Sequence, residues 1–416
     1  MLEMRKMKDS GIEWIGEIPE GWEVGQIGQL YSERRTKVSD KDYPPLSVTM
    51  KGILPQLSTA AKTDAHDDRK LVCKGDFAIN SRSDRRGSCG ISEQDGSISL
   101  INTVLKPRGE MNPGYYNWLF HTSMFADEFY KWGHGIVDDL WTTGWSDMKK
   151  IGVPVPSKCE QKQLAEHLNV ECSHIDSILS KTCSSIEEYK KLKQSVITQA
   201  VTKTIYDDFG NPSKFRKLRS LCDVLSKGTT PKDIETQNDE FYCIRYLKSE
   251  NIVSNQLNLN PTFFITAETN NSLERSKLNS GDILFVIAGA SIGKVAITTA
   301  DFLPANTNQA VAFIRLSSSY QYATKYIWYF LQSDVVKQLI ALSAVQSAQP
   351  NLSLEDLGAM RLPLPDQMGC LKITDYLDAK CAEIDGLIVK KEQLVKELES
   401  YKKSLIYEVV TGKREV

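Results

Sequence analysis

The segment Gly289-Ala-Ser-Ile-Gly293-Lys294 contains residue types that hold nucleotide phosphates in other proteins. A Walker A loop needs four residues between its two glycines, a serine or threonine after its lysine, and a helix that begins there. Here three residues separate the glycines, Val295 follows the lysine, and strand-like sequence lies on both sides. We therefore interpret the segment as a connection between two strands rather than as a nucleotide-binding site.

A second candidate for chemistry is Asn112-Pro-Gly-Tyr115, which is similar to the Asn/Asp-Pro-Pro-Tyr/Phe motif of adenine amino-methyltransferases. Gly114 replaces the second proline, and no glycine-rich cofactor loop precedes the segment, so a turn before a helix explains it better. The acidic pairs at 138–139 and 207–208 lack the spacing of a metal-dependent nuclease, and such pairs are usually solvated. We expect no catalytic site and no cofactor in this chain.

The composition is that of a folded protein: 416 residues, 41% of them hydrophobic and 25% charged, which predicts about two to four domains. No apolar run is long enough to span a membrane, and no segment is typical of a secretory signal. Nine cysteines without a C-x-x-C pair and five histidines without H-E-x-x-H indicate reduced thiols and no zinc site. We therefore expect a cytoplasmic protein. With a net charge of −2, any surface for nucleic acid must be local.

What remains is polar, basic and aromatic loop chemistry that suits the binding of nucleic acid. In the first half of the chain, "NSRSDRRGS" follows a strand-like run, "ERRTK" lies upstream and "GHGIVDDLWTTGWSD" lies downstream. Arginine matches guanine edges and phosphates, and three arginines this close together cannot all be buried. The candidate DNA contacts here are Arg34, Arg35, Lys37, Ser81, Arg82, Ser83, Arg85, Arg86, Thr142 and Thr143.

The second half of the chain carries candidates of a different composition. Asparagine and glutamine pair bidentately with adenine, whereas lysine and hydroxyl side chains fix phosphates. Such residues gather in "SKGTTPK", "IRYLKSENI", "ANTNQA" and "QSAQPNLS". The candidate contacts are Lys227, Thr229, Thr230, Lys232, Arg245, Tyr246, Lys248, Ser249, Asn251, Asn306, Asn308, Gln349 and Asn351.

The elements that position these loops are repeated along the chain. The segment "IGVPVP" at 151–156 has a counterpart, "MRLPLP", at 360–365, so that Pro154 and Pro363 are 209 residues apart (363 − 154 = 209). The same offset, without a gap, superposes Cys172 on Cys381 and Ile175-Asp176 on Ile384-Asp385. The chain therefore contains an internal repeat.

A long apolar-periodic segment follows each Pro-x-Pro entry. No proline or glycine interrupts residues 157–209, so one long helix, or two, is expected there. A helix of about 35 residues would span about 50 Å and needs a partner to bury its apolar stripe. The nearest partner is its own copy, so we predict a coiled-coil pair within the chain; two separate bundle helices are the alternative.

A globular segment precedes each long helix. Strand-like runs occur at 75–80, 97–102, 281–288, 294–299 and 309–316, and aromatic-rich helical stretches at 115–132 and 326–341. Trp118 aligns with Trp328 at an offset of 210 (328 − 118 = 210). The predicted fold class is α+β, with two globular domains, two long antiparallel helices and a pseudo-twofold repeat. The predicted boundaries are 1–153, 154–206, 207–362 and 363–416.

Several stretches together resemble the specificity (S) subunit of type I restriction-modification systems, and the resemblance covers the whole chain. They are the opening "KDSGIEWIGEIPEGWEV", the paired "VPVP" and "LPLP" entries, the Ile-Asp pairs of the helices, "KGTTPK" and "AQPNLSLEDL". The resemblance implies two target-recognition domains, each of which reads one half of a split double-stranded DNA sequence. It also implies that the two helices form an antiparallel spacer that sets the distance between the half-sites.

The same resemblance implies a non-catalytic chain with catalytic partners. Two modification (methyltransferase) subunits would carry the S-adenosylmethionine and adenine chemistry, and restriction (translocase-nuclease) subunits would carry ATP, Mg²⁺ and cleavage. The loops of the two globular segments have little in common, so we expect two different half-sites and an asymmetric target. The alternative function is a coiled-coil scaffold for protein assembly without a DNA role; an NTPase or methyltransferase is the third reading.

Overall fold

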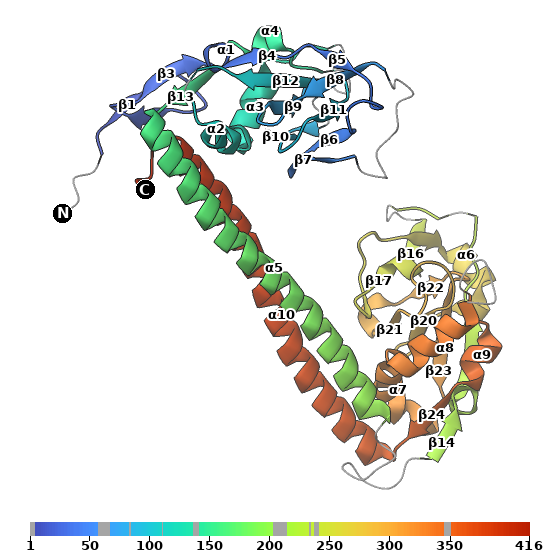
Figure 1. Ribbon diagram of the computed structural model, residues 1–416. Helices are drawn as coiled ribbons and strands as arrows, with labels where there is room; N and C mark the ends of the chain where they lie inside the picture. Colours follow the sequence, from blue (N-terminus) through green and yellow to red (C-terminus); the bar gives the residue numbers. More distant parts are fainter. Residues whose placement is uncertain are drawn as a thin grey trace. The chain divides into compact units, whose positions relative to one another are not determined.

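The computed structural model describes residues 5–56, 67–82, 85–109, 111–135, 141–202, 214–232, 234–236, 241–344 and 351–416. The chain divides into two compact units. Unit 1 comprises Met1–Cys183 and Gln393–Val416, and unit 2 comprises Ser184–Glu392. Each unit contains one β-rich domain and part of each of two long helices, α5 (Lys158–Thr202) and α10 (Gln367–Val410) (Figure 1).

Helices α5 and α10 pack against each other in antiparallel directions, as the sequence predicts (Figure 1). Residues 158–202 form one helix rather than two. Within the described ranges, no helix combines the length and the apolarity needed to cross a membrane. The buried stripe of α5 includes Leu164, Leu168, Cys172, Ile175, Ile186, Ile197 and Val201, and that of α10 includes Cys370, Ile373, Leu377, Cys381, Ile384, Leu405 and Val409.

Two symmetry-related ion pairs join the helices. In unit 1, Lys402 Nζ lies 2.6 Å from Asp176 Oδ1, and in unit 2, Lys193 Nζ lies 2.6 Å from Asp385 Oδ2. The offset of 209 relates both members of each pair (385 − 176 = 209; 402 − 193 = 209). The carboxylates are more than half exposed, and an exposed pair contributes at most about 1 kcal/mol. The pairs therefore fix the register of the helices more than they stabilise them.

The largest sheet of each unit has four strands in the same order, which confirms the internal duplication. In unit 1 the order is β10-β9-β12-β4, and in unit 2 it is β21-β20-β23-β15. Neighbouring strands are antiparallel in both sheets. The strands are β4 (Tyr31–Glu33), β9 (Phe77–Asn80), β10 (Cys89–Ile91), β12 (Asn102–Pro107), β15 (Cys222–Lys227), β20 (Ile283–Val286), β21 (Val295–Ile297) and β23 (Val311–Leu316).

Smaller sheets and short helices complete each domain. Unit 1 has β1 (Met7–Asp9), β2 (Glu17–Pro19), β3 (Glu23–Gln26), α1 (Ile27–Leu30), β5 (Lys37–Val38), β6 (Leu46–Thr49), β7 (Gly52–Pro55), β8 (Arg69–Val72), β11 (Gly96–Ile98), α4 (Trp145–Met148) and β13 (Gly152–Val155). Unit 2 has β14 (Lys214–Lys217), η4 (Leu218–Leu221), β16 (Tyr242–Leu247), η5 (Ser249–Asn251), β17 (Ile252–Val253), β18 (Gln256–Leu257), β19 (Phe264–Thr266), α6 (Ala267–Ser272), η6 (Glu274–Ser276), η7 (Ala300–Phe302), β22 (Ala305–Thr307), η8 (Ser318–Ala323), α9 (Leu354–Ala359) and β24 (Arg361–Leu364).

One predicted strand is wrong. The run at 97–102 is the end of β11, a turn and the start of β12. The Asn102 backbone amide and side-chain amide both donate to the Ser99 carbonyl, which closes the turn. Leu100 and Ile101 consequently lie exposed in the turn, although their apolar character suggested a strand.

Each aromatic-rich stretch forms two short helices rather than one. They are α2 (Pro113–Phe120) and α3 (Ser123–Lys131) in unit 1, and α7 (Thr324–Leu331) and α8 (Asp334–Ala344) in unit 2. The break in unit 1 falls at Thr122, whose hydroxyl accepts a hydrogen bond from the Phe125 amide and caps α3. Helices α2 and α7 begin 211 residues apart (324 − 113 = 211), one more than the offset that aligns Trp118 with Trp328.

A tyrosine from each of these helices attaches the domain to the end of a long helix. In unit 1, the Tyr115 hydroxyl donates to the Val410 carbonyl at 2.6 Å. In unit 2, the Tyr326 hydroxyl donates to the Pro363 carbonyl at 2.6 Å and lies 3.2 Å from the Val201 carbonyl. Val410 and Val201 are equivalent in the repeat (410 − 201 = 209), so a tyrosine meets the equivalent carbonyl of a long helix in both units.

A buried aspartate at the start of a central strand holds an arginine in each unit. Asp282 accepts from Arg315 Nε at 2.8 Å and from Arg315 Nη2 at 2.7 Å, and its side chain is 1% exposed. The corresponding residue of unit 1 is Asp76, which holds Arg34. Both aspartates also accept a backbone amide three residues upstream, from Asn279 and Cys73.

We expect Asp282→Ala to destabilise unit 2 by about 2–4 kcal/mol, because it leaves the partly buried Arg315 guanidinium without its counter-charge. Asp176→Ala removes an exposed ion pair and should lower the free energy of unfolding by less than about 1 kcal/mol. Urea denaturation of both variants checks this. Equal destabilisation would contradict the structural role of Asp282.

Candidate nucleic-acid interface

The fold brings the predicted contact loops to the same edge of the four-stranded sheet in both units. In unit 1, β4 and β9 are both antiparallel to β12, so residues 34–37 and 81–82, which follow them, leave the sheet at one edge. In unit 2, β15 and β20 are both antiparallel to β23. Segment 227–232, at the end of β15, therefore leaves the sheet at the edge where β23 begins. Residues 306–309 directly precede β23 and lie at the same edge.

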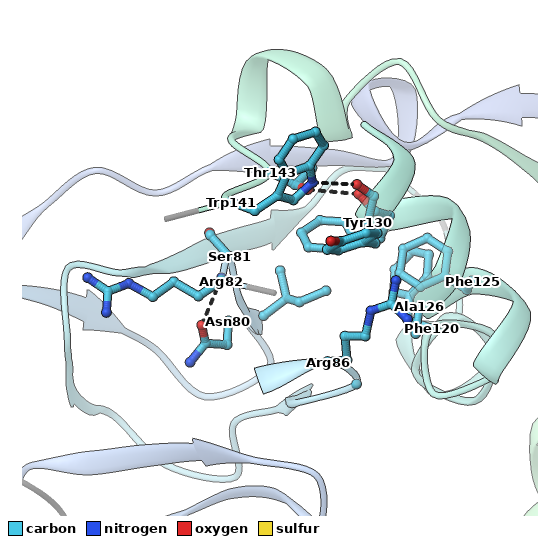
Figure 2. Close-up of a pocket in the computed structure, with 13 residues that line it drawn as sticks. Asn80, Ser81, Arg82, Arg86, Phe120, Phe125, Ala126, Tyr130, Trp141 and Thr143 are labelled. Carbon is cyan, nitrogen blue, oxygen red and sulfur yellow. Dashed lines mark hydrogen bonds between the residues drawn. The ribbon is translucent and has the colours of Figure 1, made fainter. Parts of the chain in front are cut away.

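A shallow pocket lies at this edge of unit 1 (Figure 2). Its walls come from the end of β9, the loop that follows β9, the helices α2 and α3, and the segment 141–143. The floor is aromatic and the rim is basic and polar. The lining residues are Ile79, Asn80, Ser81, Arg82, Arg86, Gly87, Phe120, Phe125, Ala126, Phe129, Tyr130, Trp141 and Thr143.

Arg86 is held over the aromatic wall of this pocket. Its guanidinium carbon lies 4.0 Å from the centroid of the Tyr130 ring, and its Nη1 lies 3.1 Å from Asp127 Oδ1. Tyr130 in turn packs against Trp141, with 5.7 Å between ring centroids. The guanidinium is about half exposed, so its remaining N–H groups are open to a ligand while the side chain is already oriented.

Hydrogen bonds lock the three segments that form the pocket. Thr143 donates its hydroxyl to the Phe129 carbonyl at 2.7 Å and its amide to the Ser81 carbonyl at 2.9 Å. Trp141 Nε1 donates to the Tyr130 carbonyl at 2.9 Å. A Cβ at Gly133 would lie 2.2 Å from Trp141 Nε1, so a larger residue there would displace the indole. Thr143 is thus a structural residue, buried beneath the rim.

Of the other predicted residues of this rim, some have exposed side chains and one is hydrogen-bonded within unit 1. Arg82, Arg85 and Thr142 are exposed, and the backbone of Arg82 pairs with that of Thr142. The Ser81 hydroxyl is 2.9 Å from that of Thr103, so it is partly engaged. Ser83 lies outside the described residues.

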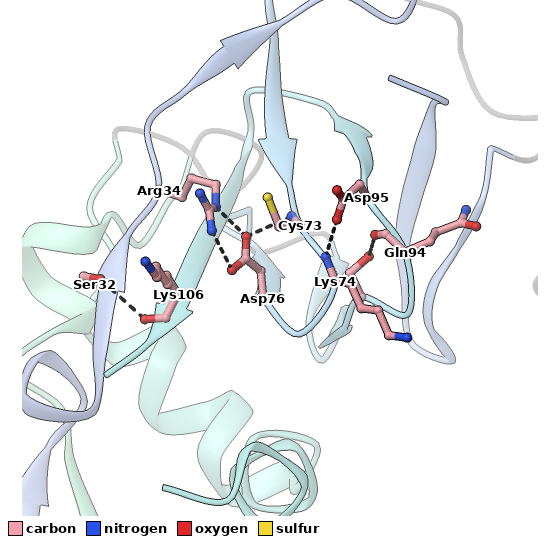
Figure 3. A network of polar contacts seen from close by, with 9 residues as sticks. Ser32, Arg34, Cys73, Lys74, Asp76, Gln94, Asp95 and Lys106 are labelled. Atoms are coloured by element: carbon pink, nitrogen blue, oxygen red, sulfur yellow. Dashed lines mark hydrogen bonds and ion pairs between the residues drawn. The ribbon is translucent and has the colours of Figure 1, made fainter. Parts of the chain in front are cut away.

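The cations of the "ERRTK" segment have carboxylate partners. Arg34 contacts Asp76 through Nε and Nη2, and these hydrogen bonds raise its pKa (Figure 3). Arg35 and Lys37 are exposed and pair with Glu33 and Asp68 at 2.6 Å each. Arg34 therefore supports the sheet, whereas the two exposed cations remain able to exchange a surface partner for a phosphate.

In unit 2, the segment 227–232 is built around a close backbone approach. A Cβ at Gly228 would lie 1.8 Å from the Thr307 carbonyl oxygen, so only glycine fits. Thr229 donates its amide to the Thr307 carbonyl at 3.1 Å and accepts the Tyr246 hydroxyl at 2.9 Å. Burial raises the pKa of Tyr246, so the phenol remains a donor at neutral pH.

Most side chains of segment 227–232 are exposed to solvent. Lys227, Thr229, Thr230 and Lys232 are exposed. The Thr230 hydroxyl contacts the Gln309 side chain. Tyr246 itself is buried and acts by holding the loop.

The predicted residues in and just after β16 contact neighbours within unit 2. Arg245 Nη1 donates to the Asp301 carbonyl at 2.7 Å, and Lys248 Nζ lies 3.5 Å from the centroid of the Phe263 ring. Lys248 and Ser249 are half-buried. These side chains are thus oriented by neighbours rather than freely extended.

The asparagines are placed differently from what their loop sequences suggest. Asn251 is buried and donates its amide to the Asn258 and Pro261 carbonyls. Asn306 is fully buried and donates to Asn270 Oδ1 and the Leu273 carbonyl. Both amides are therefore used inside unit 2. Asn351 is exposed, Asn308 is half-buried with no partner for its Oδ1 in the described part of the chain, and Gln349 lies outside the described residues.

The segments that suggested enzyme chemistry have structural roles. Residues 287–294 connect the antiparallel strands β20 and β21, as predicted, and no helix begins there. Asn112 is the N-cap of α2, and its side chain accepts the amides of Gly114 and Tyr115. Among the described residues, no three histidine, cysteine, aspartate or glutamate side chains are grouped as metal ligands.

Sequence reasoning missed Asp127, Tyr130 and Trp141, which orient Arg86. The first two lie in the aromatic-rich helical stretch at 115–132, one helical turn apart (130 − 127 = 3). That spacing is a signal that places Asp127 and Tyr130 on one face of a helix. Nothing in the sequence indicates that this face meets Arg86.

Comparison with known proteins identifies relatives along the whole chain. Residues 211–394 match the model of a family described as the type I restriction modification DNA specificity domain. The chain is 24% identical over 422 residues to the type I restriction enzyme MjaVIII specificity subunit of Methanocaldococcus jannaschii, with 95% of this chain and 93% of that protein covered. It is 28% identical over 232 residues to the type I restriction enzyme EcoBI specificity subunit of Escherichia coli, with 51% and 48% covered.

Solved structures share the fold. A chain from a structural study of the assembly and conformational transition of the type I R-M system matches with a TM-score of 0.74 and 12% identity, covering 94% of this chain and 98% of that chain. The HsdS subunit from Thermoanaerobacter tengcongensis matches with a TM-score of 0.54 and 15% identity, covering 95% and 98%. The shared fold consists of two β-rich domains and two long antiparallel helices.

Proposed function

We propose that the chain is a member of the family of type I restriction-modification specificity subunits and that its two domains read two different halves of one bipartite DNA target. Subunits of this family are non-catalytic, and the activity of their complexes resides in partner subunits. The observation that carries the proposal is the sheet edge: in both units, the exposed basic and polar loops leave equivalent strands on the same side.

The two half-sites differ because the loops differ in chemistry. Unit 1 offers arginines on an aromatic wall, which suit guanine edges and phosphates. Unit 2 offers Lys227, Thr229, Thr230, Lys232 and Asn351, which suit phosphates and adenine. We assign the first reading surface to Arg82, Arg85, Arg86 and Thr142, with Arg35 and Lys37 on its flank. Asn251 and Asn306 are left out of the proposed interface because their amides are used internally.

Partner binding completes the proposed function. Exposed apolar side chains occur on both long helices, including the equivalent positions Leu192 and Tyr401 (401 − 192 = 209). Equivalent apolar positions suit two copies of one partner, so we propose that two modification subunits dock on the helices and adjoining faces. They would supply S-adenosylmethionine and adenine methylation, and restriction subunits would supply ATP, Mg²⁺ and cleavage. A cytoplasmic location and the domain boundaries given above belong to the same proposal.

The proposal is tested on the complex of this chain with its modification subunits. Binding to the duplex target should be sequence-specific, and the logarithm of affinity should fall with the logarithm of salt concentration by about 0.9 per neutralised phosphate. Mapping methylated adenines in cells with and without this chain supplies the target. A scaffold without a DNA role would leave the methylation pattern unchanged when the chain is deleted.

Arg86→Ala should weaken binding to the target by about 5- to 150-fold, equivalent to about 1–3 kcal/mol, and relax specificity in the half-site of unit 1 only. Arg108→Ala is the matched control, because Arg108 is an exposed arginine that follows β12 at the opposite edge of the same sheet. Titration of single-base-pair variants of the target measures both effects. Equal losses from the two substitutions would contradict a reading role for Arg86.

A further inference from the structure

Unit 2 carries a compact group of cations at the sheet edge opposite the proposed reading loops. Strand β14 contributes Lys214, Arg216 and Lys217, η4 contributes Arg219, and β24 contributes Arg361. All five are exposed. Strands β14 and β24 pair so that Lys217 lies directly opposite Arg361, which places like charges side by side. We call these five residues the basic ribbon.

No described carboxylate neutralises the basic ribbon. Among the described residues, no carboxylate forms an ion pair with any of its five cations, although many other cations of the chain are paired, Lys193 and Arg315 among them. Helix α9 packs next to η4 and carries Glu355 and Asp356, but Asp356 accepts the Ser353 hydroxyl instead. Adjacent unpaired cations repel one another, so the arrangement favours an anionic partner.

Among the described residues, cations on these paired strands occur in unit 2 only. The equivalent strands of unit 1 are β3, which reads Glu-Val-Gly-Gln at 23–26, and β13, which reads Gly-Val-Pro-Val at 152–155. The nearest exposed lysines of unit 1, Lys149 and Lys150, precede β13, and Lys150 pairs with Asp147. Charged edge strands protect sheets from unwanted pairing, and lysines are common there. Edge protection alone would be needed equally in both units. The restriction of the cations to unit 2 therefore points to a partner that unit 2 meets.

The chemistry of the ribbon matches a phosphate backbone better than a protein surface. A cluster of like charges does not suit the core of a protein–protein interface, where charged residues are depleted, whereas protein–DNA interfaces are strongly positive and gain their phosphate contacts from lysine and arginine. Successive side chains of a strand point to opposite faces, and all four residues of β14 are exposed, so both faces of the strand are open. Strand β15, of six residues, separates the ribbon from the reading segment by about 20 Å.

We propose that the basic ribbon binds the phosphate backbone of double-stranded DNA beside the half-site read by unit 2. This inference rests on the proposed function, because it needs DNA bound at the loops of unit 2. The distance along β15 corresponds to the rise of about six base pairs. The contact adds affinity without sequence preference, and it extends the DNA covered on the side of unit 2 only.

The test uses the complex of the full chain with its modification subunits and a duplex that contains the mapped target. The triple variant Lys214→Gln, Arg216→Gln, Lys217→Gln removes three ribbon cations. The matched control Arg275→Gln, Lys325→Gln, Lys337→Gln removes three exposed cations of the same unit that lie on η6, α7 and α8, outside the ribbon, the reading loops and the long helices. A charge-retaining variant, Lys214→Arg, Arg216→Lys, Lys217→Arg, shows whether the positions tolerate substitution.

The ribbon variant should weaken binding to target and non-target DNA alike, by about tenfold, and reduce the salt slope by up to about 2.7, which is 0.9 for each lost cation. The control and the charge-retaining variant should keep the parental slope. An unchanged slope in a folded ribbon variant, or loss of the modification subunits instead of DNA, would overturn the proposal. If the parental complex itself shows no preference for the target, the proposed function fails rather than the ribbon.

Discussion

Replacing the first recognition domain with that of a relative is expected to change one half of the DNA target and leave the other half as it was. The affinity for the parental target should fall by about 10³-fold or more, towards non-specific binding, because every base contact of one half-site is lost together. A new target, composed of the donor's half-site and the parental second half-site, should be bound with parental affinity.

The junction of this replacement follows from the structure. Position 153 lies inside β13, where Val153 pairs with Gly25 of β3, so a junction there divides a ribbon. A junction after Pro156 keeps β13 with its partner and leaves α5, which begins at Lys158, intact. The donor must also keep a tyrosine at the position of Tyr115, because that hydroxyl bonds the end of α10.

Genome-wide mapping of methylated adenines in cells that carry the chimaera measures the outcome. The reciprocal replacement of residues 207–365, whose second junction falls after β24 and so keeps the β14–β24 pair together, is the matched control and should change only the other half. A chimaera that assembles with the modification subunits yet changes both halves, or neither, would contradict independent reading by the two domains.

The long helices could be predicted from the sequence because their signal is local and repeated. Apolar residues at helical spacing specify the buried stripe, and the gap-free offset of 209 shows that the second helix is a copy of the first. The two ion pairs Lys402–Asp176 and Lys193–Asp385 follow the same offset. A repeat of this kind constrains tertiary structure directly, because equivalent residues must find equivalent surroundings.

In the aromatic-rich helices, the alignment of the two halves by residue identity is wrong by one residue. Trp118 and Trp328 are the conspicuous match in sequence, yet the structural counterpart of Trp118 is Tyr329 (329 − 118 = 211). Trp118 Nε1 donates to Asn169 Oδ1 at 3.0 Å, and the Tyr329 hydroxyl donates to Asp378 Oδ1 at 2.8 Å, where Asn169 and Asp378 are repeat equivalents. An indole N–H makes this contact with the long helix in unit 1, and a phenol O–H makes it in unit 2. An alignment based on identical residues therefore pairs Trp118 with the wrong position.

The candidate interface could be predicted only as a set of loops. Asn251 and Asn306 have the side chains expected of base readers, but their amides satisfy buried carbonyls that no sequence pattern reveals. Arg34 is likewise used by Asp76, which is distant in sequence. Whether a polar side chain faces solvent depends on long-range contacts, and these are the information that a single sequence contains least directly.

Inserting four residues into each long helix is expected to lengthen the unspecified gap of the target by about two base pairs. Four residues add about 6 Å of helix, and each base pair adds 3.4 Å of DNA. The insertions are placed after Ser184 and after Gln393, because these two points face each other across the antiparallel helices, midway between the two ion pairs. Lys193 and Lys402 each lie nine residues beyond the insertion (193 − 184 = 9; 402 − 393 = 9), so both pairs keep their register.

Methylation of the parental target should fall by at least about 100-fold, because a misplaced half-site loses several base contacts at about 1–3 kcal/mol each. A seven-residue insertion at the same two points preserves the heptad phase and should lengthen the gap by about three base pairs. An insertion into α5 alone separates Lys193 from Asp385 and should instead impair assembly. If the doubly inserted chains assemble and methylate targets with the parental gap, then the helices do not set the spacing, and the domains must find their half-sites independently.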